Sequence, residues 1–272
     1  MIIDMHSHIL PGLDDGAEDW DEFSAMAAIA VSEGITHMVC TPHFISYEEE
    51  FSPDSYKLLL DEARINLASR GINLKLISGC EVFFTSDLEL CLQERKIITL
   101  NDSGRYLLVE FSRLDVPAST KDVFFSLKLK GITPIIAHPE RNIVFAQRPE
   151  LLKELIEHGA LCQLNTGSLT GMFGEYTKGA AEYLLKSQMI HILGSDAHSS
   201  GGRAPKFQKA LHLIEKLVGP KMLTEITGDN PLKILNGEEV EPYPVKLSMK
   251  RKSFFIEKII KKITIKLPVS FR

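Results

Sequence analysis

Short apolar segments alternate with amphipathic ones from residue 1 to about residue 235 of the 272-residue chain. The apolar segments are brief and rich in β-branched residues, which favours buried strands. They predict strands at 2–5, 37–40, 74–78, 106–109, 133–137, 161–164 and 190–193. Between and after them the apolar positions recur with a helical period. This pattern predicts helices at 19–32, 54–69, 120–130, 150–158, 176–186 and 205–217.

The ends of the predicted helices carry recognisable signals. Asp19 and Pro149 are residues that commonly begin helices. The glycines that follow helices, as expected of C-terminal caps, are Gly34, Gly71, Gly131 and Gly159. Strands that alternate with helices predict a parallel α/β sheet with right-handed crossovers. An open doubly wound sheet would give a similar pattern, but seven such units over roughly 230 residues favour a closed barrel.

The charge is distributed unevenly and suggests three parts. We expect a barrel over 1–236, a linker over 237–245 ("GEEVEPYPV") and a basic amphipathic tail over 246–272. The tail holds nine lysines and arginines against one acid, Glu257, although the whole chain has a net charge of −5. The body is therefore acidic, which argues against a nucleic-acid partner.

The tail itself has two interpretations. As a helix, residues 253–267 gather their isoleucines on one face and most lysines on the other, which is typical of a helix on an anionic membrane surface. A helix packed on the barrel is the alternative. We find no apolar run long enough to span a membrane and no basic n-region of a signal peptide, so we expect a cytoplasmic protein, peripheral at the inner face of the membrane if the tail binds there.

Polar residues follow almost every predicted strand, where a parallel barrel places its chemistry. In chain order they are His6 and His8, His43, Glu81, Glu110, His138 with Arg141, Asn165, and Asp196 with His198. Each alone could be an ordinary loop residue. Together, carboxylates and histidines converging in one barrel mouth require a cation to neutralise them, so we expect a polynuclear metal site. The other histidines, His37, His158, His191 and His212, are interpreted as structural.

The donor types narrow the chemistry. Nitrogen and oxygen donors without a thiolate favour Mn, Fe or Zn in a catalytic site over a structural zinc–thiolate site, and several metals indicate hydrolysis by metal-activated water. Arg141 lies three residues after His138, and Arg203 lies five residues after His198. The geometry of a guanidinium group suits hydrogen bonds to phosphate oxygens, so the two arginines favour a phosphate ester as the substrate. The four cysteines, expected to be reduced, lack the C-x5-R pattern of cysteine phosphatases: the sixth residues after them are Ser46, Ser86, Ile97 and Ser168.

The motifs "MIIDMHSHILPGLDDGA", "TPHF", "GCEV", "LVEF", "AHPERN" and "GSDAHS" resemble the PHP (polymerase and histidinol phosphatase) superfamily over about residues 1–235. More closely, they resemble its manganese-dependent bacterial protein-tyrosine phosphatases of capsule and exopolysaccharide operons. The resemblance implies a distorted (β/α)7 barrel with three Mn2+ ions. It assigns His6, His8, Glu81 and Asp196 to one metal, Glu81, Glu110 and His138 to a second, and Asp15, His43 and His198 to a third. Arg141 and Arg203 match the phosphate-contacting arginines.

The implied substrate is a phosphotyrosine cluster on the tail of a membrane-associated bacterial tyrosine kinase. A tyrosyl leaving group has a parent pKa of about 10, so it needs little help from a general acid. Asp14 is our candidate catalytic residue beside the two arginines, and His43 and His198 are alternatives for the acid.

Three alternatives stay open. A small-molecule phosphatase of the same fold, such as a histidinol phosphatase, would use the same residues. An amidohydrolase also opens with HxH, but it would usually offer a lysine where this chain has Glu110. A catalytically idle metal-binding regulator of polysaccharide synthesis would not need the complete ligand set or both arginines.

Overall fold

The strands of the barrel are all parallel to their neighbours. The computed structural model describes residues 1–45 and 52–247. Within them the strands are β1 (Ile2–Ser7), β2 (Ile35–Cys40), β3 (His43–Phe44), β4 (Lys75–Ser78), β5 (Glu81–Phe83), β6 (Tyr106–Glu110), β7 (Thr133–Ile136), β8 (Leu161–Asn165) and β9 (Ile192–Gly194). The seven predicted strands are confirmed, and β3 and β5 are short additions that follow β2 and β4.

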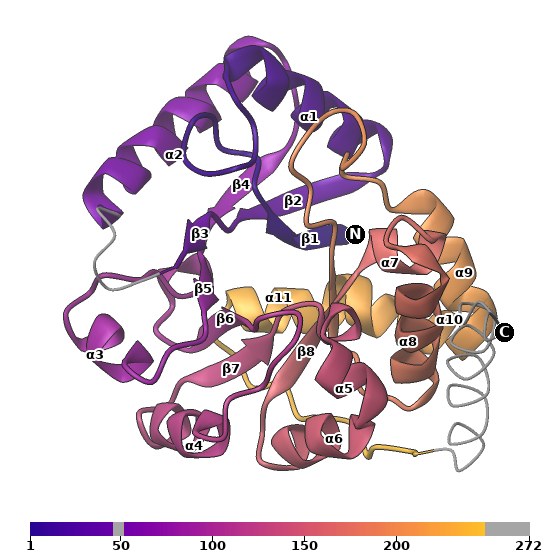
Figure 1. The fold of residues 1–272 in the computed structure, drawn as a ribbon. Coiled ribbons are helices and arrows are strands. Elements are labelled where there is room, and N and C mark those ends of the chain that lie inside the picture. The colour runs from indigo at the N-terminus through magenta and orange to yellow at the C-terminus, as the bar shows by residue number, and fades with distance from the viewer. Residues whose placement is uncertain (46–51, 248–272) are drawn as a thin grey trace, which may run out of the picture.

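The strands form two sheets that meet at both edges, so the whole curls into a distorted barrel (Figure 1). Their orders are β1-β2-β4 and β3-β5-β6-β7-β8-β9. At one edge the β2–β4 pairing leads directly into the β3–β5 pairing. At the other, Ser7 bridges to Ala197, and the backbone N–H of Asp196 donates to the carbonyl of His6 at 2.8 Å. The predicted distorted α/β barrel is confirmed as a curled parallel sheet.

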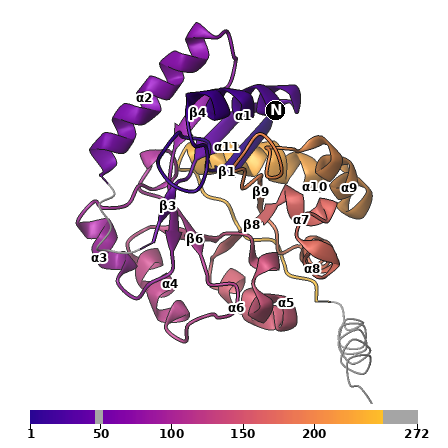
Figure 2. The ribbon, with the colours of Figure 1, turned by 45° about the horizontal axis from the view of Figure 1, so that its top comes forward.

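Most helices surround this sheet on the outside (Figures 1 and 2), whereas α11 (Asn230–Leu235) lies within the ring in the view of Figure 1. The helices are α1 (Trp20–Ser32), α2 (Pro53–Ser69), α3 (Leu88–Gln93), α4 (Thr120–Leu129), α5 (Ile143–Gln147), α6 (Pro149–Glu157), α7 (Thr166–Thr170), α8 (Gly174–Lys186), α9 (Gln208–Val218), α10 (Pro220–Thr224) and α11. The six predicted helices are confirmed. The pattern missed α3, α5, α7, α10 and α11, because helices of five or six residues are too short to show a period.

The predicted helix ends have clear physical causes. The Asp19 side chain accepts hydrogen bonds from the N–H groups of Asp21 and Glu22, and so caps α1. The four glycines predicted as C-terminal caps all have positive φ angles, between 68° and 92°. Helix α9 begins at Gln208 rather than at residue 205, because the Glu33 carboxylate accepts from the backbone N–H groups of Phe207 and Gln208 there.

The barrel interior is apolar at one end and polar at the other. A cluster of buried aliphatic side chains that includes Ile3, Val39 and Leu161 fills it, and Leu235 of α11 belongs to the same cluster. Along β8 the side chains alternate between faces: Leu161 joins this inner cluster, whereas Cys162 joins the outer core beneath the helices. The period therefore places the next odd-numbered residues of β8, Gln163 and Asn165, on the inner face, at the carboxyl end of the barrel.

The segment predicted as a linker packs along the N-terminal ends of the strands. The Tyr106 hydroxyl donates to the carbonyl of Glu238 (2.6 Å) and accepts from the N–H of Val240 (3.1 Å), and Val240 is buried. Further on, the ring of Tyr243 stacks on that of His191. The segment up to residue 247 is thus held against the barrel (Figure 2).

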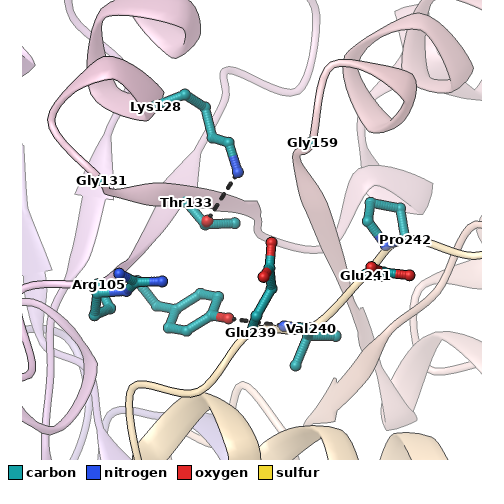
Figure 3. Close-up of a pocket in the computed structure, with 10 residues that line it drawn as sticks. Arg105, Lys128, Gly131, Thr133, Gly159, Glu239, Val240, Glu241 and Pro242 are labelled. Atoms are coloured by element: carbon teal, nitrogen blue, oxygen red, sulfur yellow. Dashed lines mark hydrogen bonds between the residues drawn. The ribbon is translucent and has the colours of Figure 1, made fainter.

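A cavity of about 210 Å³ lies between this segment and the starts of β6 and β7 (Figure 3). Its charged lining combines two cations, Arg105 and Lys128, with two carboxylates, Glu239 and Glu241.

Most of the predicted basic tail, residues 248–272, lies outside the described residues. Among the residues that are described, no helix is long and apolar enough to cross a membrane.

Candidate metal centre

All nine predicted metal-binding side chains converge at the carboxyl end of the barrel. They come from strand ends and from the loops that follow, and they are His6, His8, Asp15, His43, Glu81, Glu110, His138, Asp196 and His198. Six of them are buried, whereas Asp15 has a side chain that is 65% exposed. The cluster is therefore a mostly enclosed site with one open side.

Glu81 lies at the centre of this cluster. Its Oε2 is 3.1 Å from His6 Nε2 and 3.1 Å from His43 Nδ1, and its Oε1 is 3.0 Å from His138 Nε2. Oε2 is buried and, among the described residues, forms no hydrogen bond. A buried carboxylate oxygen surrounded by imidazole nitrogens is the arrangement that a bridging metal ligand requires.

The donor atoms form three groups, and within each group all atoms lie within 4.8 Å of one another. Some residues belong to two groups. The groups are His8, Asp15, His43 and His198; then His6, His8 and Glu81; then His43, Glu81 and Glu110. The resemblance divided the ligands differently, with Asp196 beside His6 and with His138 beside Glu110. The distances are 3.6 Å from Asp196 Oδ1 to His6 Nε2 and 3.7 Å from Glu110 Oε1 to His138 Nε2. The assignment of each ligand to a particular metal stays a prediction.

The pKa shifts differ from group to group within the cluster: although burial would lower the pKa values of His6, His8 and His43, the carboxylates beside them raise all three. Burial alone would raise the pKa of Glu81 and of Asp196, but His6 and the neighbouring imidazoles hold both well below their usual range. Burial, and then the charge of His8, lower the pKa of His198 to about 4, so this imidazole is neutral at pH 7. In contrast, burial and the charge of Glu81 raise the pKa of Glu110.

Local backbone geometry brings the ligands into place. His138 and Asp196 have φ angles of 30° and 52°, in the left-handed region that residues other than glycine rarely adopt. Such strain is concentrated at functional sites. Gly16 lets the loop after β1 fold over His8, since a Cβ at this position would lie 1.9 Å from the His8 carbonyl oxygen. That fold carries Asp14 and Asp15 to the site.

Asp14 lies behind His8 rather than beside the other carboxylates. Its Oδ2 is 2.6 Å from His8 Nδ1 and accepts from the backbone N–H of His43 at 3.1 Å. Burial would raise its pKa, but the hydrogen bond and charge of His8 lower it to about 2. These contacts favour an orienting role for Asp14 over the role of general acid that we considered from the sequence.

The two predicted phosphate-binding arginines both contact Asp196. Arg141 donates to Oδ2, whereas Arg203 Nη2 forms an ion pair with Oδ1 at 2.8 Å and donates to the backbone carbonyl of Asp196 at 3.1 Å. The guanidinium of Arg141 also lies 4.3 Å from the ring centre of Phe173. Arg203 Nε is buried and has no hydrogen-bond partner within the described part of the chain. The mouth of the site thus offers unused donors to an anion.

The cysteines are poor candidates for the chemistry. Cys40, Cys80, Cys91 and Cys162 are all free and buried. Burial raises the pKa of Cys80 to about 12 and raises the pKa values of the other three thiols. A thiolate is therefore disfavoured at neutral pH at each of these positions, which supports an all-N,O donor set.

Sequence reasoning missed several polar residues behind the ligands. Asp4 is fully buried in β1 and accepts hydrogen bonds from the N–H (2.8 Å) and the hydroxyl (2.5 Å) of Ser195. Glu140 is buried and accepts from the hydroxyl of Ser168. Gln163 contacts His6. The available signal was a polar residue inside an apolar strand, as at Asp4 and Gln163.

The chain is similar to a described protein family and to known phosphatases. The chain matches the family described as capsular polysaccharide synthesis, CpsB/CapC, over residues 2–236. It is 36% identical over 256 residues to the tyrosine-protein phosphatase YwqE of Bacillus subtilis (strain 168), which covers 93% of this chain and 99% of YwqE.

Two solved structures share the fold of this chain. One, of YwqE from Bacillus subtilis and CpsB from Streptococcus pneumoniae, described as unique metal-dependent tyrosine phosphatases, matches with a TM-score of 0.85 and 35% identity, covering 90% of this chain and 100% of that one. The histidinol phosphate phosphatase of Lactococcus lactis matches with a TM-score of 0.52 and 15% identity over 80% of this chain and 92% of that one, which shows a shared fold alone. The resemblance inferred from the motifs is confirmed, and the chain belongs to the CpsB/CapC family of capsular polysaccharide synthesis.

Proposed function

We propose that this chain is a metal-dependent tyrosine phosphatase that hydrolyses phosphotyrosine on a membrane-associated bacterial tyrosine kinase of capsule or exopolysaccharide synthesis. The observation that carries the proposal is the convergence of nine residues with N or O donors, Glu81 among them, and the contacts of Arg141 and Arg203 with Asp196. The names of its relatives and the description of its family support the substrate class.

The metal proposed for this site is Mn2+, with Fe or Zn as alternatives. The donor set fits such ions because it combines imidazoles with carboxylates and lacks thiolates, and because Glu81 Oε2 has no hydrogen bond from the residues that the structure describes. His6, His8, Glu81 and Asp196 would hold one ion, Glu81, Glu110 and His138 a second, and Asp15, His43 and His198 a third. When bound, the ions would activate water and neutralise charge on the phosphoryl group.

The side chains around the metals have separate roles in this proposal. Arg141 and Arg203 bind the phosphoryl oxygens, because a guanidinium has five N–H donors and Asp196 occupies only some of them. Asp196 and the ring of Phe173 fix the direction of Arg141. Asp14 keeps His8 in one orientation, and the tyrosyl group leaves without a strong acid because its pKa is about 10.

A comparison of two substrates tests the proposed function. We expect kcat/KM to be far higher for a phosphotyrosine peptide than for histidinol phosphate, with both measured in Mn2+. Phosphoserine in the same peptide is the control, since its alkoxide leaving group has a much higher pKa. Preferred turnover of histidinol phosphate would instead identify a small-molecule phosphatase.

We also propose that the tail, residues 246–272, binds the anionic inner surface of the membrane and brings the barrel to its kinase substrate. The support comes from the sequence: nine cations and an apolar stripe in 253–267. The barrel of 1–236 and the segment 237–245 would then be the cytoplasmic body of the enzyme.

Co-sedimentation with vesicles tests the role of the tail. The full chain should bind phosphatidylglycerol-containing vesicles, whereas a chain ending at Leu247, which keeps the contacts of Tyr243 and Lys246, should not. The charge reversals Lys258→Glu, Lys261→Glu and Lys262→Glu in the full chain should also abolish binding. Equal binding by the full and shortened chains would show that the tail is not the membrane contact.

A further inference from the structure

A buried amide side chain behind the metal centre connects two of its proposed ligands. Gln163 is fully buried on the inner face of β8. Its Oε1 lies 3.1 Å from His6 Nδ1 and 3.1 Å from the backbone nitrogen of His138. Its Nε2 donates to Asn165 Oδ1 at 2.8 Å. No charged group is part of these contacts to Gln163.

The backbone of His138 fixes the orientation of this amide. A backbone N–H can only donate, so the Gln163 atom that faces it must be the oxygen. The same oxygen faces His6 Nδ1, which must therefore carry a proton in order to donate. In the neutral ring His6 Nε2 then has the lone pair, and this nitrogen lies 3.1 Å from Glu81 Oε2. An imidazole that binds a metal through Nε2 needs this tautomer.

The other end of the amide continues to Asp196. Asn165 is also fully buried, and its Oδ1 accepts from Gln163, so its Nδ2 faces Asp196 Oδ2 at 2.7 Å. Arg141 donates to the same carboxylate oxygen. With Oδ2 held in this way, Oδ1 is the oxygen that faces the imidazoles, 3.6 Å from His6 Nε2.

Gly194 supplies independent evidence that His6 and Gln163 are tightly packed against the neighbouring strand β9. A Cβ at position 194 would lie 2.5 Å from His6 Cβ and 2.7 Å from Gln163 Nε2. The strand beside Gln163 therefore has no side chain where His6 and the amide meet. Only a glycine leaves room for both groups at their observed positions.

We propose that Gln163 is a positioning residue that sets the tautomer of His6 and, through Asn165, the direction of the Asp196 carboxylate, so that both groups are ready to bind metal. His8 is oriented by a carboxylate, Asp14, whereas His6 is oriented by a neutral amide. The proposal rests on the metal site of the proposed function, but not on its phosphotyrosine substrate.

Metal affinity measured without substrate tests this proposal. Gln163→Met has nearly the same shape but no acceptor, so Mn2+ affinity by calorimetry should fall by about 10–100-fold. Gln163→Glu keeps an acceptor for His6 Nδ1–H but loses the donor to Asn165 Oδ1, so it should lose less affinity than Gln163→Met. Gln93→Met on the exposed face of α3 is the matched control and should change nothing. If Gln163→Met does not fold, Gln163→Asn serves in its place, because it withdraws the oxygen by one methylene.

Proton NMR of the Zn2+-loaded chain gives a second readout, the His6 Nδ1–H signal. This signal would not change if Gln163 had a purely structural role. The His6 Nδ1–H signal, assigned by its absence in His6→Ala, should be downfield and protected from exchange in the wild-type chain and in Gln163→Glu. It should be lost in Gln163→Met. Unchanged affinity and an unchanged His6 signal in Gln163→Met would overturn the proposal. So would a folded Gln163→Glu that loses as much affinity as Gln163→Met. A wild-type chain that binds neither ion would instead refute the metal site itself.

Discussion

Removal of bound metal with EDTA should abolish hydrolysis of a phosphotyrosine peptide, and added Mn2+ should restore it. Without metal, the site offers only imidazoles and carboxylates, which are weak nucleophiles. Several of these imidazoles also contact the Glu81 carboxylate. The rate should fall to background, which is the largest effect we expect.

Iodoacetamide distinguishes this account from thiol chemistry. All four cysteines are buried, and burial raises the pKa of each thiol, so alkylation of the folded chain should leave the rate unchanged. A cysteine phosphatase would show the opposite pattern, with resistance to EDTA and inactivation by iodoacetamide.

Replacement of either rim arginine should separate catalysis from metal binding. Arg141→Ala or Arg203→Ala removes a charge-assisted contact to the transferring phosphoryl group, which should lower kcat by about 10²–10³-fold. Bound metal per chain should stay near the wild-type level, because neither guanidinium is a proposed ligand and Asn165 still holds Asp196 Oδ2 in both variants. His6→Ala should instead lose metal together with activity.

Two controls make the arginine result specific. Lysine at the same positions keeps a charge but loses the planar pair of donors, so Arg141→Lys should recover only part of the rate. Arg70→Ala, at the exposed end of α2, should match the wild-type chain. An arginine variant that emptied the metal site would show that the arginine holds the ligands rather than the substrate.

The location of the site could be predicted from the sequence because its residues follow strand periods. His6 and His8 are two residues apart after an apolar run, as are Asp196 and His198, and a parallel barrel brings all strand ends to one rim. These rules concern positions along single strands. They needed no knowledge of which strands are neighbours.

The division of ligands among metals could not be predicted from the residues in this way. His8 and His43 each belong to two donor groups, and this depends on the ring orientations that Asp14 and the barrel curvature impose. Gln163 was missed for a related reason: its role depends on His6, which is 157 residues away in the sequence. The packing of the predicted linker depends on the Tyr106 hydroxyl, another long-range contact.

A titration of the metal-stripped wild-type chain with Mn2+ tests the central claim most directly. Bound metal and phosphotyrosine-peptide hydrolysis are measured in the same samples. We predict no hydrolysis in the metal-free chain, a rate that rises with bound metal, and a plateau when the cluster around Glu81 is filled. Full hydrolysis without metal, or a chain that fills with metal and hydrolyses no phosphotyrosine, would contradict the account.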